Sequence, residues 1–359
     1  MSANVTREAV LEALGRVQEP ELNNDLVSLG MVKDLNLEDG VVEFTIELTT
    51  PACPLQDQIK GDAQDAVKAL EGVSDVIVHL SANVPSSGTP QVLDGNNIRN
   101  AIAVASGKGG VGKTTVAVNI AVALAEAGAS VGLLDADIYG PNVPTMMGVE
   151  RMPPPKENVI VPAESYGVKI MSIGFMVSPE QPLIWRGPML HSAIRQFINE
   201  VEWGDLDYLV IDLPPGTGDA QLSLAQSMTL SGGVIVTLPQ KISLEDARRG
   251  LEMFRAMEVP MLGIVENMSY LELPDGSKVD VFGQGGGAKL ARATGVPLIG
   301  SIPMDPSVRE GGDEGVPIVI SKPDSIVALA LTGIAEELAA KVSLQALGGS
   351  EVLEIEMLD

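Results

Sequence analysis

The most informative run in the chain is Gly107-Lys108-Gly109-Gly110-Val111-Gly112-Lys113-Thr114-Thr115. It follows the apolar run Ala101–Ala105, which is typical of a buried strand, and precedes the helical run VAVNIAVALAEAG, which is closed by Gly128. The letters match G-x-x-x-x-G-K-[ST] in the strand–loop–helix context that this motif needs. Glycines let backbone N–H groups converge on phosphate oxygens, and the helix amino terminus adds partial positive charge. The run therefore predicts a loop that binds the phosphates of a nucleoside triphosphate.

Two further features of the motif predict how the triphosphate is held. Lys113 would reach the β- and γ-phosphates, and Thr114 would bind Mg²⁺. A second acidic turn, Asp212-Leu213-Pro214-Pro215-Gly216, follows the apolar strand Tyr208–Ile211. An acid at the end of such a strand suits the water shell of the magnesium ion, opposite the loop threonine.

The same loop also satisfies the dinucleotide pattern G-x-G-x-x-G, through Gly107, Gly109 and Gly112. Asp135 ends the next predicted strand, where a ribose-binding acid of a dinucleotide fold would lie. That alternative leaves Lys113 unexplained and gives no role to Asp212. The triphosphate interpretation is favoured for these reasons.

From Ile98 onward, apolar strands, turns and amphipathic helices alternate. The strand candidates are IAVAS, VGLLDAD, YLVIDLPP, GVIVTLP, MLGIVEN and PLIGSIP. This pattern predicts an α/β fold, a doubly wound, mostly parallel sheet with helices on both faces and ligands at the carboxyl ends of its strands. We expect this domain over residues 98–347, followed by an acidic tail over residues 348–359.

Residues 1–82 predict a separate small α+β domain. Val10, Leu11, Leu14 and Val17 form one apolar helical face, and Glu38-Asp39-Gly40 is a hairpin signal. In the second hairpin arm, Val42, Phe44, Ile46 and Leu48 alternate with polar residues, as in a sheet with one wet face. A helix over residues 57–70 and a strand over residues 76–80 complete the domain. Residues 83–97, rich in Pro, Ser, Gly and Asn, predict a flexible linker.

Composition restricts the partners and the compartment. The 359 residues include 23 basic and 48 acidic side chains, for a net charge of −25, and only 3% are aromatic. Such a field repels phosphate backbones and anionic lipids, so we expect neither nucleic acid nor membrane as a partner. The one cysteine, Cys53, cannot form an intramolecular disulfide, and no membrane span or secretory signal is evident. A soluble cytoplasmic protein is expected.

The early lysine of the loop, Lys108, makes a family resemblance specific. GKGGVGKTT resembles the deviant Walker A motif of the MinD/ParA superfamily. DADIYGPNVP (135–144), IDLPPGTGD (211–219), GIVENMSY (263–270) and FGQGGG (282–287) together resemble the Mrp/ApbC-type ATPases, whose members are taken to carry iron–sulfur clusters to apoproteins. The amino-terminal part, with LTTPACPLQDQI (48–59), resembles the MIP-type domain linked to iron–sulfur assembly. The resemblance covers essentially the whole chain.

The resemblance implies a role for individual residues. Lys108 would cross a dimer interface to the nucleotide of the partner, Asp137 would position the attacking water, and Asp212 would support the metal. Gly216 would sense the γ-phosphate, while Asn267 and the Pro303–Asp305 turn would hold adenine, which makes ATP the expected nucleotide. Simpler alternatives are a turn residue for Asp137 and a strand-end cap for Asn267. The full predicted nucleotide set is Gly107, Lys108, Gly109, Gly110, Val111, Gly112, Lys113, Thr114, Thr115, Asp137, Asp212, Gly216, Asn267, Pro303 and Asp305.

One segment departs from the family pattern. The family carries C-x-x-C after the E-N-M-S-Y motif, and two chains together offer four thiolates to a shared cluster. Here the letters are Leu273-Pro274-Asp275-Gly276, and Cys53 is the only cysteine. Three interpretations remain: a transient cluster bound by Cys53 and non-protein thiols, an ATP-driven adaptor for another carrier, or a replaced activity. Cys53 also has the ordinary interpretation of a small buried apolar residue.

These features lead to two functional hypotheses. In the first, the chain is a slow ATPase acting as a homodimer, with ATP and Mg²⁺ as cofactors, that delivers clusters to apo iron–sulfur proteins or cooperates with assembly factors. In the second, ATP only controls dimerisation, as in positioning proteins of the MinD/ParA kind. A membrane version would need a basic amphipathic tail, and a DNA version a basic patch; the sequence shows neither. A nucleotide-dependent reductase would need cysteines that the chain lacks.

Overall fold

The computed structural model describes residues 5–86, 91–93, 96–137, 140–156, 159–176 and 187–348. The chain divides into two compact units, one comprising Met1–Pro85 and Ala339–Asp359 and the other Ser86–Leu338. The predicted acidic tail, from residue 349 onward, lies outside the described residues. No helix among the described residues is long and apolar enough to span a lipid bilayer.

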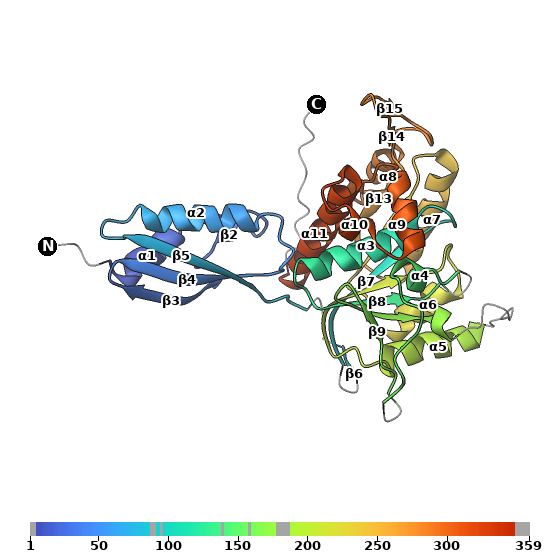
Figure 1. The fold of residues 1–359 in the computed structure, drawn as a ribbon, viewed down its shortest axis with the longest axis horizontal. Helices are drawn as coiled ribbons and strands as arrows, with labels where there is room; N and C mark the ends of the chain where they lie inside the picture. Colours follow the sequence, from blue (N-terminus) through green and yellow to red (C-terminus); the bar gives the residue numbers. More distant parts are fainter. Residues whose placement is uncertain are drawn as a thin grey trace. The chain divides into compact units, whose positions relative to one another are not determined.

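The amino-terminal unit is built on a three-stranded sheet (Figure 1). Strands β3 and β4 are antiparallel, β4 and β5 are parallel, and helices α1 and α2 contact each other. The bounds are α1 Arg7–Leu14, β1 Gln18–Glu19, β2 Asn24–Asp25, β3 Val32–Glu38, β4 Val41–Leu48, α2 Gln56–Lys68 and β5 Asp75–Ala82. The predicted hairpin is confirmed between β3 and β4, where Asp39 and Gly40 adopt positive φ values of 46° and 83°.

The core of this unit follows from the alternation in β4. Val42, Phe44 and Ile46 are fully buried and Leu48 is nearly so, while the residues between them are half-buried. The buried face packs with Val10 and Leu14 of α1 and with Ile59, Ala63 and Val67 of α2. The predicted one-faced sheet is therefore confirmed.

The second unit contains a nine-stranded sheet in which β16-β13-β12-β7-β11-β8-β10-β9 are neighbours in that order and β6 pairs with β7. All pairs are parallel except those made by β9 and β6. The bounds are β6 Gln91–Leu93, β7 Asn96–Ser106, β8 Val131–Asp135, β9 Ala163–Ser165, β10 Val168–Ser172, β11 Asp205–Asp212, β12 Gly232–Thr237, β13 Met261–Glu266 and β16 Leu298–Ser301. The predicted mostly parallel sheet is confirmed.

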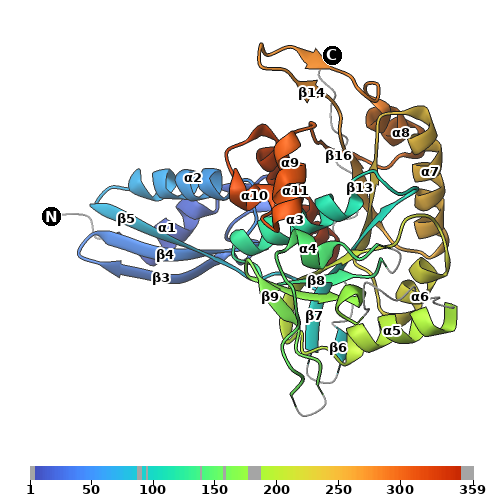
Figure 2. The same ribbon diagram turned by 45° about the vertical axis from the view of Figure 1, so that its right-hand side comes forward.

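Helices cover both faces of this sheet (Figures 1 and 2). On one face, Phe197 of α5, Leu224 of α6 and Leu251 of α7 join a single apolar cluster with strand residues. On the other, α3 contacts β7, β8, β10 and β11, and α9 contacts α4 and α10. The bounds are α3 Lys113–Glu126, α4 Val143–Met146, α5 Gly187–Asn199, α6 Asp219–Ser227, α7 Lys241–Ala256, α8 Gly286–Thr294, α9 Pro306–Glu314, α10 Ile318–Ser321 and α11 Ile326–Ala346, with a short 3-10 turn, η1, at Ile173–Phe175.

The predicted linker over residues 83–97 requires a correction. Residues 87–90 and 94–95 lie outside the described part, but Gln91–Leu93 forms β6 and pairs antiparallel with the start of β7. The physical reason lies in Asn96, which is buried: its amide donates to the Val201 carbonyl (2.7 Å) and accepts from the Gly204 N–H (2.9 Å). Long-range bonds of this kind order a segment that looks like a linker by composition. Three further features were not predicted from the sequence: β9, β10 and a small hairpin, β14 (Leu271–Glu272) with β15 (Lys278–Val279).

Candidate nucleotide-binding site

The loop at Gly107–Thr115 joins β7 to the amino terminus of α3, as predicted. Gly110 and Gly112 have φ values of 78° and 81°, a left-handed conformation that favours glycine. Gly107 lies against the backbone of α7: an added Cβ would stand 2.1 Å from the carbonyl carbon of Asp246. A Cβ on Gly112 would stand 2.2 Å from the side-chain nitrogen of Asn267. Close packing therefore explains Gly107, backbone conformation explains Gly110, and both reasons apply at Gly112.

Four side chains meet at the floor of the loop. The Lys113 ammonium donates to Asp212 Oδ1 at 2.6 Å and lies 3.6 Å from Asp137 Oδ2. The Thr114 hydroxyl donates to the other oxygen, Asp212 Oδ2, at 2.7 Å. Asp212 is fully buried, so desolvation raises its pKa while Lys113 opposes the rise. The fold thus brings the predicted lysine, threonine and two acids into one cluster.

Asp135 has a different environment from the ribose-binding acid of a dinucleotide fold. It is fully buried, accepting from the Ser172 hydroxyl (2.8 Å) and from the backbone N–H groups of Asp137 (3.1 Å) and Val143 (3.3 Å). Burial and the neighbouring Asp212 raise the pKa of Asp135 to about 8. The side chain supports the segment that carries Asp137, and it does not line the cavity described next. The dinucleotide alternative loses its ribose contact.

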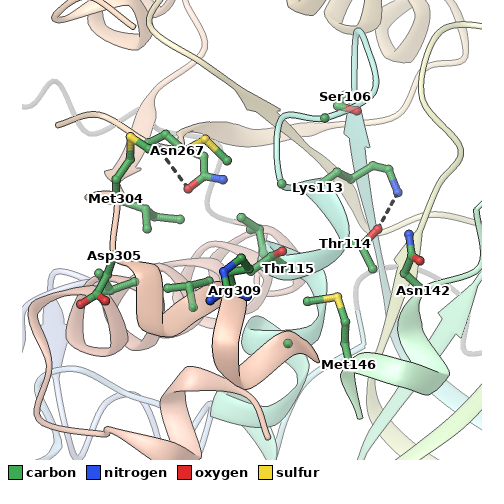
Figure 3. A pocket seen from close by; sticks show the side chains of 18 of the residues that line it. Ser106, Lys113, Thr114, Thr115, Asn142, Met146, Asn267, Met304, Asp305 and Arg309 are labelled. Carbon is green, nitrogen blue, oxygen red and sulfur yellow. Dashed lines mark hydrogen bonds between the residues drawn. The ribbon is translucent and has the colours of Figure 1, made fainter. Parts of the chain in front are cut away.

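A cavity of about 770 Å³ opens over the loop (Figure 3). One wall comes from the phosphate loop and the start of α3, including Lys108, Lys113 and Thr115, and Asp137 also lines it. The opposite wall comes from residues 302–313, at the end of β16 and along α9. Predicted residues that line the cavity are Lys108, Gly109, Gly110, Gly112, Lys113, Thr114, Thr115, Asp137, Asn267, Pro303 and Asp305. Sequence elements that are more than 180 positions apart share one cavity.

Asn267 follows β13 and lines this cavity, but its amide has structural partners. The side-chain nitrogen donates to the Val111 carbonyl at 2.8 Å, and the side-chain oxygen accepts from the Met268 N–H at 2.9 Å. One asparagine therefore braces the phosphate loop while facing the cavity. Asp305 uses its carboxylate to cap α9, accepting from the Ser307 N–H at 2.7 Å.

The remaining predicted residues lie outside the cavity lining. Gly107 and Val111 belong to the loop but face the protein, and Asp212 lies beneath it. Gly216 (φ 96°) donates its N–H to the Ser106 carbonyl at 2.9 Å, which ties the turn after β11 to the end of β7. Cys53 is buried in the core of the amino-terminal unit.

The cavity is also lined by residues outside the predicted nucleotide set. They are Ser106, Val116, Asn142, Thr145, Met146, Pro215, Met268, Leu271, Ile302, Met304, Pro306, Val308, Arg309, Gly312, Asp313, Val327 and Leu331. Arg309 had one usable signal: it lies in the first helical turn after the turn assigned to adenine. The apolar lining from α11 had none, because no motif marks it.

The segment that replaces the family C-x-x-C forms the tip of the β14–β15 hairpin. Leu273 N–H donates to the Ser277 carbonyl (2.9 Å) and Gly276 N–H to the Leu273 carbonyl (2.8 Å). Asp275 accepts from the N–H (2.9 Å) and the hydroxyl (2.6 Å) of Ser277. Among the described residues, no group of three or more His, Cys, Asp and Glu side chains is arranged to hold a metal ion.

Comparison with known proteins agrees with this geometry. The model of the NUBPL iron-transfer P-loop NTPase family matches residues 97–339, and that of an iron–sulfur cluster assembly protein family matches residues 7–80. An iron–sulfur cluster carrier protein of Synechocystis sp. is 54% identical over 352 residues, 96% of this chain and 99% of that protein.

Solved structures point the same way. The nucleotide-binding protein of Archaeoglobus fulgidus in complex with ADP is 39% identical, with a TM-score of 0.54, over 61% of this chain and 87% of that one. The septum site-determining protein MinD of Pyrococcus horikoshii, complexed with Mg-ADP, is 26% identical, with a TM-score of 0.51, over 67% of this chain and 95% of that one. The resemblance to Mrp/ApbC-type and MinD/ParA proteins is confirmed. The chain belongs to the NUBPL iron-transfer P-loop NTPase family.

Proposed function

We propose that this protein is an ATP-hydrolysing iron–sulfur cluster carrier or assembly factor of the Mrp/ApbC type, acting in the cytoplasm as a nucleotide-controlled homodimer. The observation that carries the proposal is the cluster of Lys113, Thr114 and Asp212 beneath a glycine-rich loop, at one end of a cavity large enough for a nucleotide. The carrier name of the Synechocystis relative and the ADP complex of the Archaeoglobus relative support it.

The residues around the loop suit phosphoryl transfer to water. Lys113 would neutralise charge that develops on the γ-phosphate, and the loop N–H groups would orient the phosphate chain. Asp137, 3.6 Å from the Lys113 ammonium, would orient the attacking water. Lys108, on the cavity wall, would act on the nucleotide of the partner subunit. Gly216, tied to Ser106, would sense the γ-phosphate.

The donor set also fits Mg²⁺. Thr114 and Asp212 offer a hydroxyl and a carboxylate that are already adjacent at 2.7 Å. Magnesium prefers oxygen ligands and usually takes one or two from the protein, with waters and phosphates completing the octahedron. Thr114 and Asp212 would hold the ion, and the ion would supply positive charge to the triphosphate. The Pro303–Asp305 turn and Asn267 would contact the base, with ATP as the nucleotide.

The cargo is the least constrained part of the proposal. Iron–sulfur clusters are usually held by four thiolates, and this chain has one cysteine, which is buried. A homodimer therefore offers only two. The hairpin at residues 273–276 specifically favours a second candidate function, in which the protein is an ATP-driven adaptor that binds no cluster itself. Its partners would be apo iron–sulfur proteins or assembly factors in either case.

Calorimetry with Mg-ATP tests the nucleotide assignment, and absence of magnesium-dependent binding would reject it.

We expect Lys108→Ala to impair hydrolysis or ATP-dependent dimerisation while leaving the fold intact. Unchanged turnover and an unchanged monomer–dimer balance would refute the role of Lys108 in the partner.

Anaerobic loading with iron and sulfide separates the two functions. Wild type and Cys53→Ser are compared side by side. A transferable cluster that is present in wild type and lost in the variant supports carriage. No cluster in either protein supports the adaptor.

A further inference from the structure

The cavity has a cation that neither the phosphate-loop motif nor the expected base contacts account for. Arg309 lies on α9, in the wall opposite the loop, and lines the same cavity as Lys113 and Thr115. Among the described residues that line the cavity, the basic side chains are Lys108, Lys113 and Arg309. Only Arg309 comes from the wall that carries the base contacts.

The position of Arg309 along α9 is informative. The helix begins directly after the Pro303–Asp305 turn, and Arg309 lies four residues beyond Asp305, which caps the helix. In Figure 3, Arg309 lies between Asp305 and Thr115. We place the base at the turn and the β- and γ-phosphates at the loop. The part of the nucleotide between them, which includes the α-phosphate, then lies beside Arg309. The chemical group there that a guanidinium recognises is the α-phosphate.

The present partners of Arg309 are weak competitors for such a group. The guanidinium lies 2.9 Å from Asp313 and 3.4 Å from Glu310, both on the same helix. Arg309 and Asp313 are 67% and 68% exposed, and exposed ion pairs of this spacing contribute little to stability. The di- or triphosphate chain carries more negative charge than one carboxylate, and its α-phosphate offers non-bridging oxygens that can accept hydrogen bonds from the guanidinium. Exchange of partners is therefore inexpensive, and a protein of net charge −25 needs local cations to hold an anion.

We propose that Arg309 binds the α-phosphate of the nucleotide that is bound to its own chain. Asp313 holds the guanidinium beside the cavity until the phosphate replaces Asp313 as its partner. This inference rests on the proposed nucleotide binding and adds a residue to it. Arg309 is a binding residue in this assignment and takes no part in proton transfer.

The primary experiment is calorimetric titration of Mg-ATP and Mg-ADP into wild type, Arg309→Ala and Arg309→Lys. Loss of a charge-assisted hydrogen bond predicts about tenfold weaker binding in Arg309→Ala. The factor should be similar for ATP and ADP, because both carry the α-phosphate. Arg309→Lys should recover part of the loss. The matched control is Arg16→Ala, which removes another exposed arginine from an i,i+4 pair, with Glu12 at 2.7 Å.

A second variant separates a phosphate contact from a general effect of charge. Asp313→Asn should tighten ADP binding about twofold by releasing Arg309, and this gain should vanish in the Arg309→Ala background. The proposal is overturned if Arg309→Ala binds ADP within twofold of wild type, or if the Asp313→Asn gain persists without Arg309. If wild type itself binds no nucleotide, the proposed function fails first. Melting curves without nucleotide should coincide for all the variants, whereas a structural role would lower that of Arg309→Ala.

Discussion

The phosphate loop and the β14–β15 hairpin handle their functional groups in opposite ways. At the phosphate loop, Lys113 is buried and pairs with the buried Asp212 beneath it at 2.6 Å. The α7 backbone and the Asn267 side chain pack closely against two of the loop glycines. In the hairpin, residues 272–280 are exposed and the turn is closed by Asp275 and Ser277 through local bonds alone.

This difference indicates that the proposed nucleotide site and the family's cluster site can change independently. Phosphate recognition depends largely on backbone N–H groups, whose positions are fixed by packing across several strands. The C-x-x-C ligands of the resembled family would be side chains at an exposed turn, and the bonds that close this turn here are local. We therefore expect substitutions in the phosphate loop to disturb the fold, and substitutions at the hairpin tip to leave it intact. Variants in the two regions test this contrast.

The largest effect is expected for Lys113→Ala. It removes the cation that we propose neutralises the γ-phosphate, and turnover should fall by at least about a hundredfold. It also leaves Asp212 buried without its ion-pair partner, so the thermal unfolding midpoint should drop. Phosphate release and a melting curve measure the two effects. Turnover within a few-fold of wild type would reject the assignment of the loop.

A pair of variants tests whether close packing demands glycine at the start of the loop. Gly107→Ala places a Cβ against the α7 backbone, and overpacking of this kind costs about 1–3 kcal/mol. Gly109→Ala is the control, because nothing lies within 4 Å of its added Cβ. Thermal unfolding without nucleotide should separate the two variants. Equal midpoints would show that the close approach at Gly107 is not a constraint.

Restoring the missing ligands tests the hairpin. The double variant Leu273→Cys/Gly276→Cys places C-x-x-C at the tip and should retain more iron and acid-labile sulfide after anaerobic reconstitution than wild type. Gly276 has a φ of 80°, so a side chain there costs about 1 kcal/mol of strain. Leu273→Ser/Gly276→Ser carries the same strain without thiols and serves as the control. Equal iron in the two double variants would mean that the hairpin is no longer a usable site.

The smallest effect concerns Asp275 and pH. Hydrogen bonds from Ser277 hold the pKa of Asp275 below its usual 3.8. Because the pKa is lower in the folded state, the ionised carboxylate stabilises the turn at pH values above its unfolded-state pKa. This stabilisation is lost as the pH falls through the folded-state pKa. The protection of the Ser277 amide, measured relative to its intrinsic exchange rate at each pH, should therefore decrease below about pH 4 in wild type. In Asp275→Asn this acid step should be absent, and an identical acid profile would contradict the assignment.

The sequence predicted most of the local structure. The glycine-rich loop, the strand before it and the helix after it follow from spacing and apolar pattern. So does the β3–β4 hairpin at Asp39-Gly40. These are short-range properties, set by which φ values a residue tolerates and which face it can bury. The failure at residues 91–97 has the same origin, because composition cannot report the bonds that Asn96 makes to residues more than a hundred positions away.

The sequence by itself determined that this chain carries the pattern of a phosphate-binding loop, since glycine spacing and a following helix are local facts, and that it lacks four thiolates, since cysteine can be counted. Only the tertiary structure decided which distant groups complete the site. In the folded chain, Lys113 pairs with Asp212 and Asn267 bonds to the loop carbonyl of Val111. Asp135 lies outside the cavity lining, and Arg309 lies on the wall opposite the loop. Such contacts depend on how strands are ordered in the sheet, and strand order is a property of the whole packed chain that no single stretch encodes.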